Sequence, residues 1–283
     1  EHGVCVRPAD VNFSFWDCTL EDIDGAADNP APNNPALRLG LRQIKGIRKQ
    51  DAEKLIAVRE AGNARPFSDA EDLWRRSGLG PKVLERLARA DAWGSTGLNR
   101  RQAQWAARRL PAAPLPLFAE TGEGIHEPEV TLPVMAPGEE VSHDYASIRL
   151  SLKAHPLALL RDGLNKEGVV RTAQLGEIEN GRRVTIAGLV ITRQRPGTAS
   201  GVIFATLEDE TGSANVIVWP RMSERYRKET YTARLLVVTG ELQREGLVIH
   251  VIAQKMQDRT EALYALADGS NTGTPSYKSR DFH

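Results

Sequence analysis

The chain has 283 residues, enough for about two domains that each bury a core. Lys plus Arg and Asp plus Glu both number 37, so the formal net charge is zero, which excludes a uniformly basic nucleic-acid-binding protein. Cys5 and Cys18 cannot form a framework of disulfides, and they lack the spacing of a zinc site. Because the sequence has neither a run of roughly 20 apolar residues nor a signal pattern, we expect a soluble, cytoplasmic protein without a metal site.

Residues 36–110 have the apolar spacing of short helices that are interrupted by glycine. Apolar residues recur at intervals of three and four over 37–44, stop at Gly46, and recur again over 52–61. This pattern predicts two short helices joined by a turn at residues 45–47.

The pattern then repeats. A second pair of helices is predicted over 68–76 and 81–90, with Pro81 well placed as the first helical residue, and one more helix over 99–110. Helix, glycine turn and helix, twice in succession, is the layout of a tandem helix-hairpin-helix domain. Such a turn lets a phosphate approach the backbone closely and meet the open N–H groups of the next helix. The alternative is that the glycines merely end helices in a small bundle.

Residues 111–151 are rich in proline and acidic side chains, and no Lys or Arg interrupts the acidic stretch 120–144. Such a composition predicts an extended linker. One apolar island within it, Leu115, Leu117 and Phe118, resembles half of the peptide that bacterial replication proteins insert into the sliding clamp. The alternative is that these side chains hold the linker against the helical domain.

Residues 182–257 read as short strands separated by turn signals. Three strand-like runs are followed by a helix-compatible segment over 220–230 and by two more runs joined at Glu245-Gly246. This order predicts a five-stranded, partly open barrel of the OB type, whose second and third strands commonly bind oligonucleotides. The predicted fold class is therefore α+β and multidomain, with a tandem helix-hairpin-helix domain followed by an OB-type five-stranded β-barrel.

Short motifs also occur in the order in which one known family carries them. The first group is Gly3 to Glu21, Leu37 to Gly46, Leu98 to Arg101, and Leu152 to Leu157. These motifs resemble the C-terminal third of bacterial C-family DNA polymerases. A second group resembles specifically the error-prone branch, the damage-induced homologue of the DNA polymerase III alpha subunit: Arg193 to Ala199, Leu207 to Gly212, and Lys278 to Phe282.

The resemblance implies a division of the chain into parts, and the chain would be a piece of a longer protein. These parts are 1–35, the end of the upstream, fingers-side polymerase region; 36–110, the tandem helix-hairpin-helix domain; 111–151, the Pro- and acid-rich linker; 152–181, a short helical connector; 182–262, the OB-fold; and 263–283, the C-terminal tail.

The resemblance also implies an activity for the parent protein. The family is a DNA-directed DNA polymerase, a nucleotidyltransferase that uses Mg²⁺ for error-prone translesion synthesis and DNA repair. Its palm carboxylates would lie upstream of Glu1, so no catalytic residue is carried over, and this segment would be inactive alone and hold no cofactor. Its expected role is to bind primer–template duplex and single-stranded template.

Two sets of residues are expected to hold DNA. Around the hairpins they are Arg42, Lys45, Gly46, Arg48, Lys49, Gly78, Gly80, Lys82, Arg100 and Arg101. On the barrel they are Arg193, Arg195, Phe204, Trp219, Arg221, Arg244 and Lys255. The two aromatic residues of the barrel would stack on bases, although an aromatic residue among apolar strands can equally well fill the core.

Two other interpretations stay open. In the first, linker and barrel form a protein-interaction module that docks damage-tolerance accessory proteins and contacts DNA little. The resemblance implies recruitment to the sliding clamp, directly or through an adaptor, which fits the island from Leu115 to Phe118. In the second, the barrel binds tRNA as in some synthetases, an interpretation that rests on the strand pattern alone.

Overall fold

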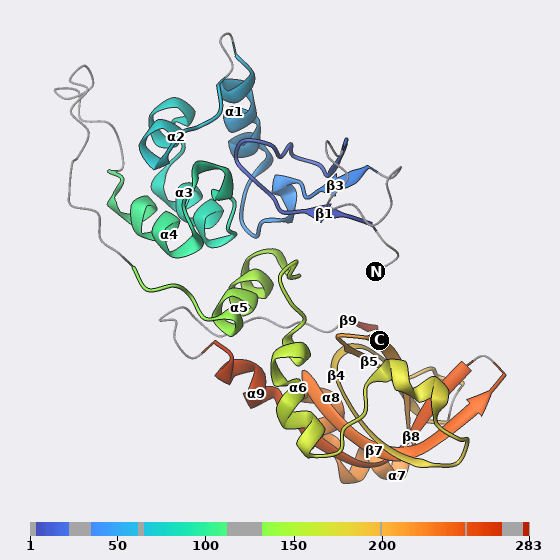
Figure 1. Cartoon of the computed structure of the whole chain (residues 1–283). Coiled ribbons are helices and arrows are strands. Elements are labelled where there is room, and N and C mark those ends of the chain that lie inside the picture. Colours follow the sequence, from blue (N-terminus) through green and yellow to red (C-terminus); the bar gives the residue numbers. More distant parts are fainter. Residues whose placement is uncertain are drawn as a thin grey trace. The chain divides into compact units, whose positions relative to one another are not determined.

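The computed structural model of the protein describes residues 4–22, 35–61, 65–111, 132–198, 200–246, 248–267 and 280–282 (Figure 1). The chain divides into two compact units. The helical unit comprises residues 1–135 and 147–152, and the barrel unit comprises residues 136–146 and 153–283. None of the helices in the described part of the chain has the length and apolar character needed to span a membrane.

Within its described residues, the helical unit combines a small sheet with four α-helices. Strand β3 lies between β1, to which it is parallel, and β2, to which it is antiparallel. The elements of the unit are β1 (Val6–Arg7), β2 (Thr19–Glu21), β3 (Ala36–Arg38), η1 (Leu41–Gln43), α1 (Lys49–Glu60), α2 (Ala70–Ser77), α3 (Pro81–Arg89), η2 (Gly94–Thr96) and α4 (Arg100–Arg109).

Local sequence explains where most of these helices begin and end. The Asp69 side chain caps the first turn of α2, and α2 ends at Gly78, which has a left-handed backbone. Pro81 occupies the first turn of α3. Asn99 and Gln102 form a capping box at the start of α4. The helices then bury their apolar faces in one core, whose fully buried members include Phe67, Leu41, Leu55, Leu84 and Trp93.

The first predicted helix of this unit was wrong. Residues 36–38 form strand β3, and residues 41–43 form only one 3-10 turn before the hairpin. A strand forms here in place of a helix because pairing partners come from elsewhere in the chain: Leu37 lies opposite both Val6 and Leu20. In addition, Arg38 donates to the Glu21 carboxylate at 2.8 Å. Tertiary pairing thus overrides the helical spacing of the apolar residues.

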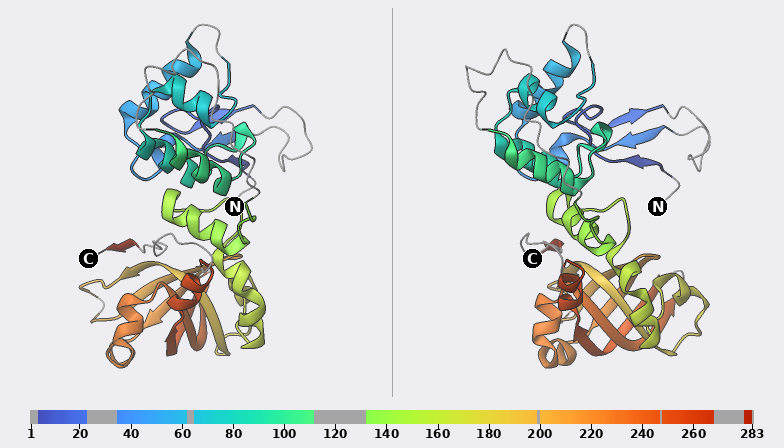
Figure 2. Two further views of the ribbon diagram at one scale, coloured as in Figure 1. Left: turned by 90° about the vertical axis from the view of Figure 1, so that its left-hand side faces the viewer. Right: turned by 60° about the vertical axis from the view of Figure 1, so that its left-hand side comes forward.

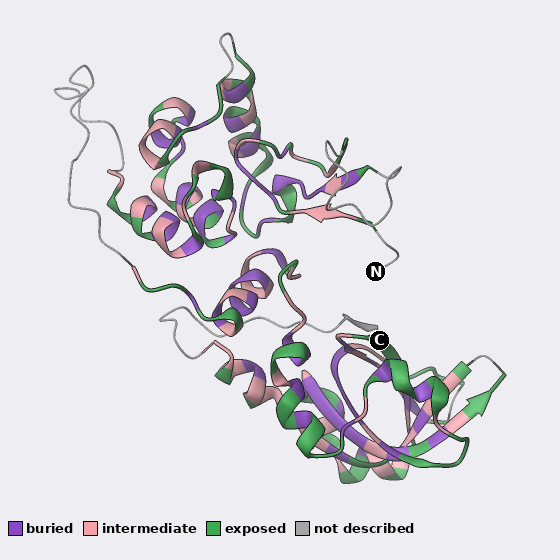
Figure 3. Ribbon diagram, viewed as in Figure 1, coloured by how far each residue is buried: buried purple, intermediate pink, exposed green. Residues whose placement is uncertain are grey.

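The barrel unit has five strands that close on themselves, as the sequence predicts. The order around the barrel is β5-β6-β8-β7-β4, and β4 pairs again with β5. The strands are β4 (Arg183–Gln194), β5 (Ile203–Asp209), β6 (Gly212–Val218), β7 (Leu235–Glu245) and β8 (Val248–Asp258). Figure 2 shows these strands curving around the core. Along β5, buried and half-buried residues alternate, as expected for a strand with one face inside. Figure 3 shows buried residues along the strands of the barrel.

Helices and one further strand complete this unit. Strand β9 (Arg280–Phe282) runs parallel to β4 and pairs with residues 192–194 of β4. The helices are α6 (Pro156–Lys166), η4 (Thr172–Glu177), α7 (Pro220–Arg225), α8 (Arg227–Thr232) and α9 (Thr260–Ala265). Leu157 of α6 and Leu263 of α9 are fully buried in a second small core with Ala187 and Leu235.

Helix α5 (Pro137–Ile148) lies within the stretch 111–151 that was expected to be extended. Its sequence contains a helix-start signal, although the overall composition of the stretch is that of a linker. Pro137 is the first helical residue, where its missing N–H costs nothing, and Glu139 and Glu140 favour the positive end of the helix dipole. Proline there begins a helix and does not break one.

Candidate nucleic-acid interface

The helices that follow the two glycine turns begin differently from the other helices of the unit. No side chain caps α1, which follows Gly46, or α3, which follows Gly78 and Gly80. By contrast, Asp69 caps α2 and Asn99 caps α4. The N–H groups of Lys49 and Gln50 in α1 and that of Lys82 in α3 are therefore left for an external anion such as a phosphate. Pro81 has no N–H, and the N–H of Val83 bonds to the carbonyl of Gly80.

The pKa of Asp69 shows that its carboxylate binds the open N–H groups at the start of α2. Burial acts to raise this pKa, but the N–H of Asp72, the Ser68 hydroxyl and the N–H of Glu71 lower it, and the net pKa lies below its usual value. The carboxylate is thus charged at neutral pH. An external phosphate would be repelled there, so α2 is not a phosphate site.

Gly46 has the backbone conformation that its role requires. Its φ is +83°, in the left-handed region that residues other than glycine rarely adopt. A Cβ at this position would also lie 3.1 Å from Nε of Arg86. The residue is exposed, so the first hairpin is open to a ligand.

Arg86 connects the first hairpin to the helix of the second. Its Nη1 donates a hydrogen bond of 2.7 Å to the carbonyl oxygen of Gly46. Lys82 and Arg86 are four residues apart on α3, so they share one face of that helix. Sequence reasoning missed Arg86, although this basic spacing was a signal that could have found it.

The predicted basic residues of the first hairpin differ in how free they are. Lys45 and Arg48 are exposed, and within the described residues neither forms an ion pair. Lys49 pairs loosely with Glu53 at 3.7 Å, and Arg42 pairs with Asp17 at 2.6 Å. Both pairs are exposed, and exposed ion pairs are weak, about 0–1 kcal/mol, so a phosphate can compete for these cations.

At the second hairpin the predictions need correction. Arg100 is buried, with 0% of its side chain exposed, and lies 3.7 Å from Asp91, so it cannot reach a DNA backbone. Gly80 has φ −68°, which any residue adopts, and Gly78, with φ +60°, supplies the turn. Lys82 is exposed in the first turn of α3, and Arg101 is half-buried on α4.

On the barrel, Phe204 and Trp219 lie on the outer face and not in the core. Phe204 lies opposite Ile217 of β6, which lies opposite Ile252 of β8, and all three are half-buried. Trp219 follows β6 and is 52% exposed. This answers the question that the sequence left open, since the barrel core contains neither aromatic residue. Both are placed where bases could stack.

Two of the predicted barrel arginines are held by the protein itself. Arg193 donates to the carbonyl of Thr230 at 2.7 Å and to that of Ala233. Arg244 donates to the carbonyl of Gly176 at 2.7 Å and to that of Ile178 at 3.1 Å. These guanidinium groups fasten loops to the barrel. Arg193 is half-buried between two carbonyls, so its assignment as a DNA contact is corrected, whereas Arg244 is exposed and its assignment stays a prediction.

The other three predicted barrel cations are exposed and donate to no carbonyl or carboxylate in the described residues. Arg195 follows the end of β4, and Arg221 lies in the first turn of α7 next to Trp219. Lys255 lies opposite Thr239 of β7, in a small polar hollow, and so belongs to a different part of the barrel from Phe204. Only Arg195 and Arg221 remain as companions of the aromatic residues.

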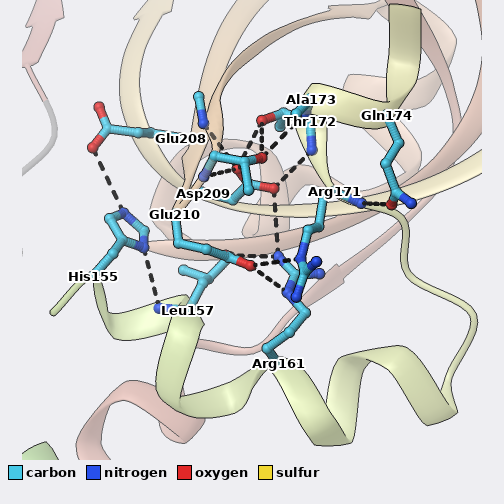
Figure 4. A network of polar contacts seen from close by, with 12 residues as sticks. His155, Leu157, Arg161, Arg171, Thr172, Ala173, Gln174, Glu208, Asp209 and Glu210 are labelled. Carbon is cyan, nitrogen blue, oxygen red and sulfur yellow. Dashed lines mark hydrogen bonds and ion pairs between the residues drawn. The ribbon is translucent and has the colours of Figure 1, made fainter. Parts of the chain in front are cut away.

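A buried network of charged groups fixes the turn between β5 and β6 to α6 and η4 (Figure 4). Arg161 of α6 donates from Nε to Glu210 at 2.6 Å and lies 3.4 Å from Asp209. Asp209 also accepts from the Thr172 backbone N–H at 2.8 Å and from the Thr172 hydroxyl at 2.7 Å. The side chain of Arg161 is 5% exposed and that of Asp209 is 0% exposed.

The same contacts lower the pKa values of both carboxylates. Burial acts to raise the pKa of Asp209, but the hydroxyl and backbone hydrogen bonds from Thr172 and Thr211 outweigh it. For Glu210 burial is likewise outweighed, here by the hydrogen bond from Arg161. The acidic turn is therefore a charged, internally satisfied structural element. The clamp-like residues Leu115, Leu117 and Phe118 lie outside the described residues.

Comparison with known families agrees with these two units. A family described as "Helix-hairpin-helix motif" matches residues 3–103, and one described as "OB-fold nucleic acid binding domain" matches residues 184–259. Both parts of the predicted fold are thus confirmed.

Curated relatives cover nearly the whole chain. An error-prone DNA polymerase of Ruegeria pomeroyi is 52% identical over 93% of this chain. The chain is homologous to the C-terminal part of the error-prone DNA polymerases. Error-prone DNA polymerase 1 of Rhizobium meliloti is 45% identical over 93% of the chain, and the error-prone DNA polymerase of Brucella abortus is 47% identical over 94% of it. The chain spans only 23%, 25% and 24%, respectively, of the lengths of these three relatives.

Among solved structures, an asparaginyl-tRNA synthetase from Pyrococcus horikoshii is 25% identical over 28% of this chain and 20% of its own, with a TM-score of 0.25. A likeness of that size supports no functional argument, including the tRNA interpretation of the barrel.

Proposed function

We propose that this chain is the DNA-binding portion of an error-prone DNA polymerase that acts in translesion synthesis and DNA repair. The helical unit would hold the backbone of primer–template duplex, and the outer face of β5 and β6 would hold single-stranded template. Homology to error-prone DNA polymerases and the two nucleic-acid-binding family patterns support the proposal.

The observation that carries it is the pair of open helix starts. Helices α1 and α3 both begin without a side-chain cap, directly after exposed glycine turns, and cations without ion pairs in the described chain stand beside them. Backbone N–H groups and lysines at such places recognise phosphates and carry no base information. Binding would therefore be independent of sequence and sensitive to salt.

The polymerase reaction itself is assigned to the parent protein. Phosphoryl transfer would require Mg²⁺ held by neighbouring carboxylates. The described ranges contain no group of three or more His, Cys, Asp or Glu residues that could hold a metal ion. The contribution of this chain would be to position DNA.

The test is a fluorescence anisotropy titration of the whole chain with labelled primer–template DNA over a range of salt concentrations. Changing Lys45, Arg48 and Lys82 to alanine should reduce the slope of log affinity against log salt by about 0.9 for each phosphate that the variant no longer neutralises. A matched control changes Arg75, Arg182 and Arg259 to alanine. These are equally charged, and each already pairs with a carboxylate at the surface.

Equal slopes for the hairpin variant and the control would refute a phosphate role of the hairpins. Absence of any binding at low salt and micromolar protein would refute DNA binding as a whole.

Partner binding is a second, separate proposal. Damage-tolerance accessory proteins and the sliding clamp would reach the chain through Leu115, Leu117 and Phe118, whose spacing resembles a clamp-binding peptide. A pull-down with the purified clamp, and with the Leu117→Ala, Phe118→Ala double variant, tests it. Unchanged capture by the double variant would exclude these residues.

A further inference from the structure

A short segment far along the chain is fixed to the two hairpins. The carbonyl oxygen of Ser147 accepts the Lys45 N–H at 2.8 Å, and the Ser147 hydroxyl donates to the carbonyl of Arg89 at 3.3 Å. Ile148 is buried in the core of the helical unit, and Leu150 packs against it. Residues 147–152 thus belong to the hairpin surface, although about a hundred residues separate them from Lys45.

Arg149 has an unusual backbone at this place. Its φ is +65°, at the end of α5, where glycine or asparagine is the common choice. A residue with a side chain is disfavoured in this conformation. Arg149 is nevertheless exposed, and in the described part of the chain its guanidinium group makes neither an ion pair nor a hydrogen bond that would compensate. A strained backbone conformation whose side chain makes no compensating contact is typical of functional sites.

Three segments thereby bring cations to one area. Lys45 comes from the first hairpin, Arg89 from the last turn of α3, and Arg149 from the segment after α5. Ser147 hydrogen-bonds to the backbone of Lys45 and to that of Arg89, and it precedes Arg149 by two residues. Arg86, one turn before Arg89, holds the carbonyl of Gly46. Each of Lys45, Arg89 and Arg149 is exposed, and no carboxylate of the described chain pairs with any of them.

We propose that Arg149, together with Lys45 and Arg89, binds the phosphodiester backbone of duplex nucleic acid next to the first hairpin. This inference rests on the proposed DNA-binding function and adds Arg89 and Arg149 to its site. The helix-hairpin-helix match covers residues 3–103, so it includes Arg89 but not Arg149. The ligand is a phosphate backbone because the area adjoins the open start of α1, and because its exposed side chains are cationic.

The experiment uses the whole chain and three changes at one position. Arg149→Ala removes the charge, Arg149→Gly removes the charge and relieves the backbone strain, and Arg149→Lys keeps the charge. Duplex binding is measured by fluorescence anisotropy between 50 and 200 mM salt, and stability is followed by thermal unfolding. Arg75→Ala, which removes an exposed arginine from α2 of the same unit, is the matched control.

We expect Arg149→Ala and Arg149→Gly each to lower the salt slope by about 0.9. Their loss of affinity should then be roughly 3.5-fold larger at 50 mM than at 200 mM salt. Arg149→Lys and Arg75→Ala should keep the slope of the unchanged chain. Arg149→Gly should also raise the melting temperature, so a weaker slope in this variant cannot result from a less stable fold.

An unchanged slope in both Arg149→Ala and Arg149→Gly, with a lowered slope in Lys45→Ala, would overturn this inference and leave the proposed function standing. An unchanged slope in Lys45→Ala as well would count against the proposed function itself. The Arg149 variants are also titrated with an acidic peptide such as polyglutamate. If Arg149→Ala loses binding to this peptide but keeps its DNA binding, the inference is overturned in favour of a protein partner.

Discussion

Some lysines and arginines of the helical unit stand unpaired beside helix starts, whereas several arginines of the barrel unit are fixed by the protein itself. In the helical unit, Lys45, Arg48 and Lys82 stand beside uncapped helix starts and have no carboxylate partner in the described residues. In the barrel unit, Arg161, Arg193 and Arg244 are bound to carboxylates or carbonyls of the protein. Basic residues therefore indicate a binding surface only where the protein itself leaves them unpaired.

The largest expected effect is the loss of the buried network in the barrel. Arg161→Ala leaves the buried carboxylate of Asp209 without its cation, and this should lower the free energy of unfolding of the barrel by about 3–5 kcal/mol. Urea denaturation measures the change. Arg182→Ala, whose exposed partner is Glu179, should change stability by less than about 1 kcal/mol. Equal effects of the two substitutions would show that the network does not hold the barrel.

Trp219→Ala tests whether the barrel contributes binding of its own. The exposed ring should stack on one base, so its loss should cost about 1–3 kcal/mol in binding of a single-stranded oligonucleotide. Trp105→Ala is the control, because that ring is 46% exposed on α4 of the helical unit. An unchanged affinity after Trp219→Ala would remove the barrel face from the proposed site.

Gly46→Ala tests the helical unit. At φ +83°, alanine is strained, and its Cβ would approach Arg86, so stability should fall by about 1–2 kcal/mol. At Gly80 the φ is −68° and the surroundings are open, so Gly80→Ala should change stability by less than about 0.5 kcal/mol. Urea denaturation followed by circular dichroism distinguishes them. Equal effects would mean that the first hairpin needs no glycine.

Acid should weaken the barrel through Asp209 and Glu210. Their folded pKa values are lowered, so their stabilisation is complete above the unfolded values of about 3.9 and 4.3 and is lost as the pH falls through the folded values. Each unit of lowering corresponds to about 1.4 kcal/mol. Denaturation at several pH values from 7 to 3 measures this, and Asp209→Asn should flatten the dependence. An equally steep dependence in Asp209→Asn would assign the effect to other groups.

Sequence alone predicted the features that depend on neighbouring residues. The five strands of the barrel, Pro81 at the start of α3 and the last helix of the helical unit all follow from local patterns. Prediction from sequence failed where pairing with residues far away in the chain decides the secondary structure. Strand β3 forms because Val6 and Leu20 pair with Leu37.

The same limit applies to the candidate site. Arg100, Arg193 and Arg244 look like any other arginine in sequence, and only the fold shows that Arg100 is buried and that the other two bind carbonyl groups. Conversely, no local pattern connects Arg149 with Lys45, because a backbone hydrogen bond through Ser147 brings their segments together.

The parallel pairing of β9 with β4 has a consequence for the solubility of the barrel. Strand β7 pairs with β4 only over residues 183–189, and β9 takes the neighbouring edge at residues 192–194. An uncovered strand edge is a template for pairing with another molecule. Shortened versions that end before Arg280 would leave these backbone groups open, so they should be checked for concentration-dependent self-association before they are used in binding work.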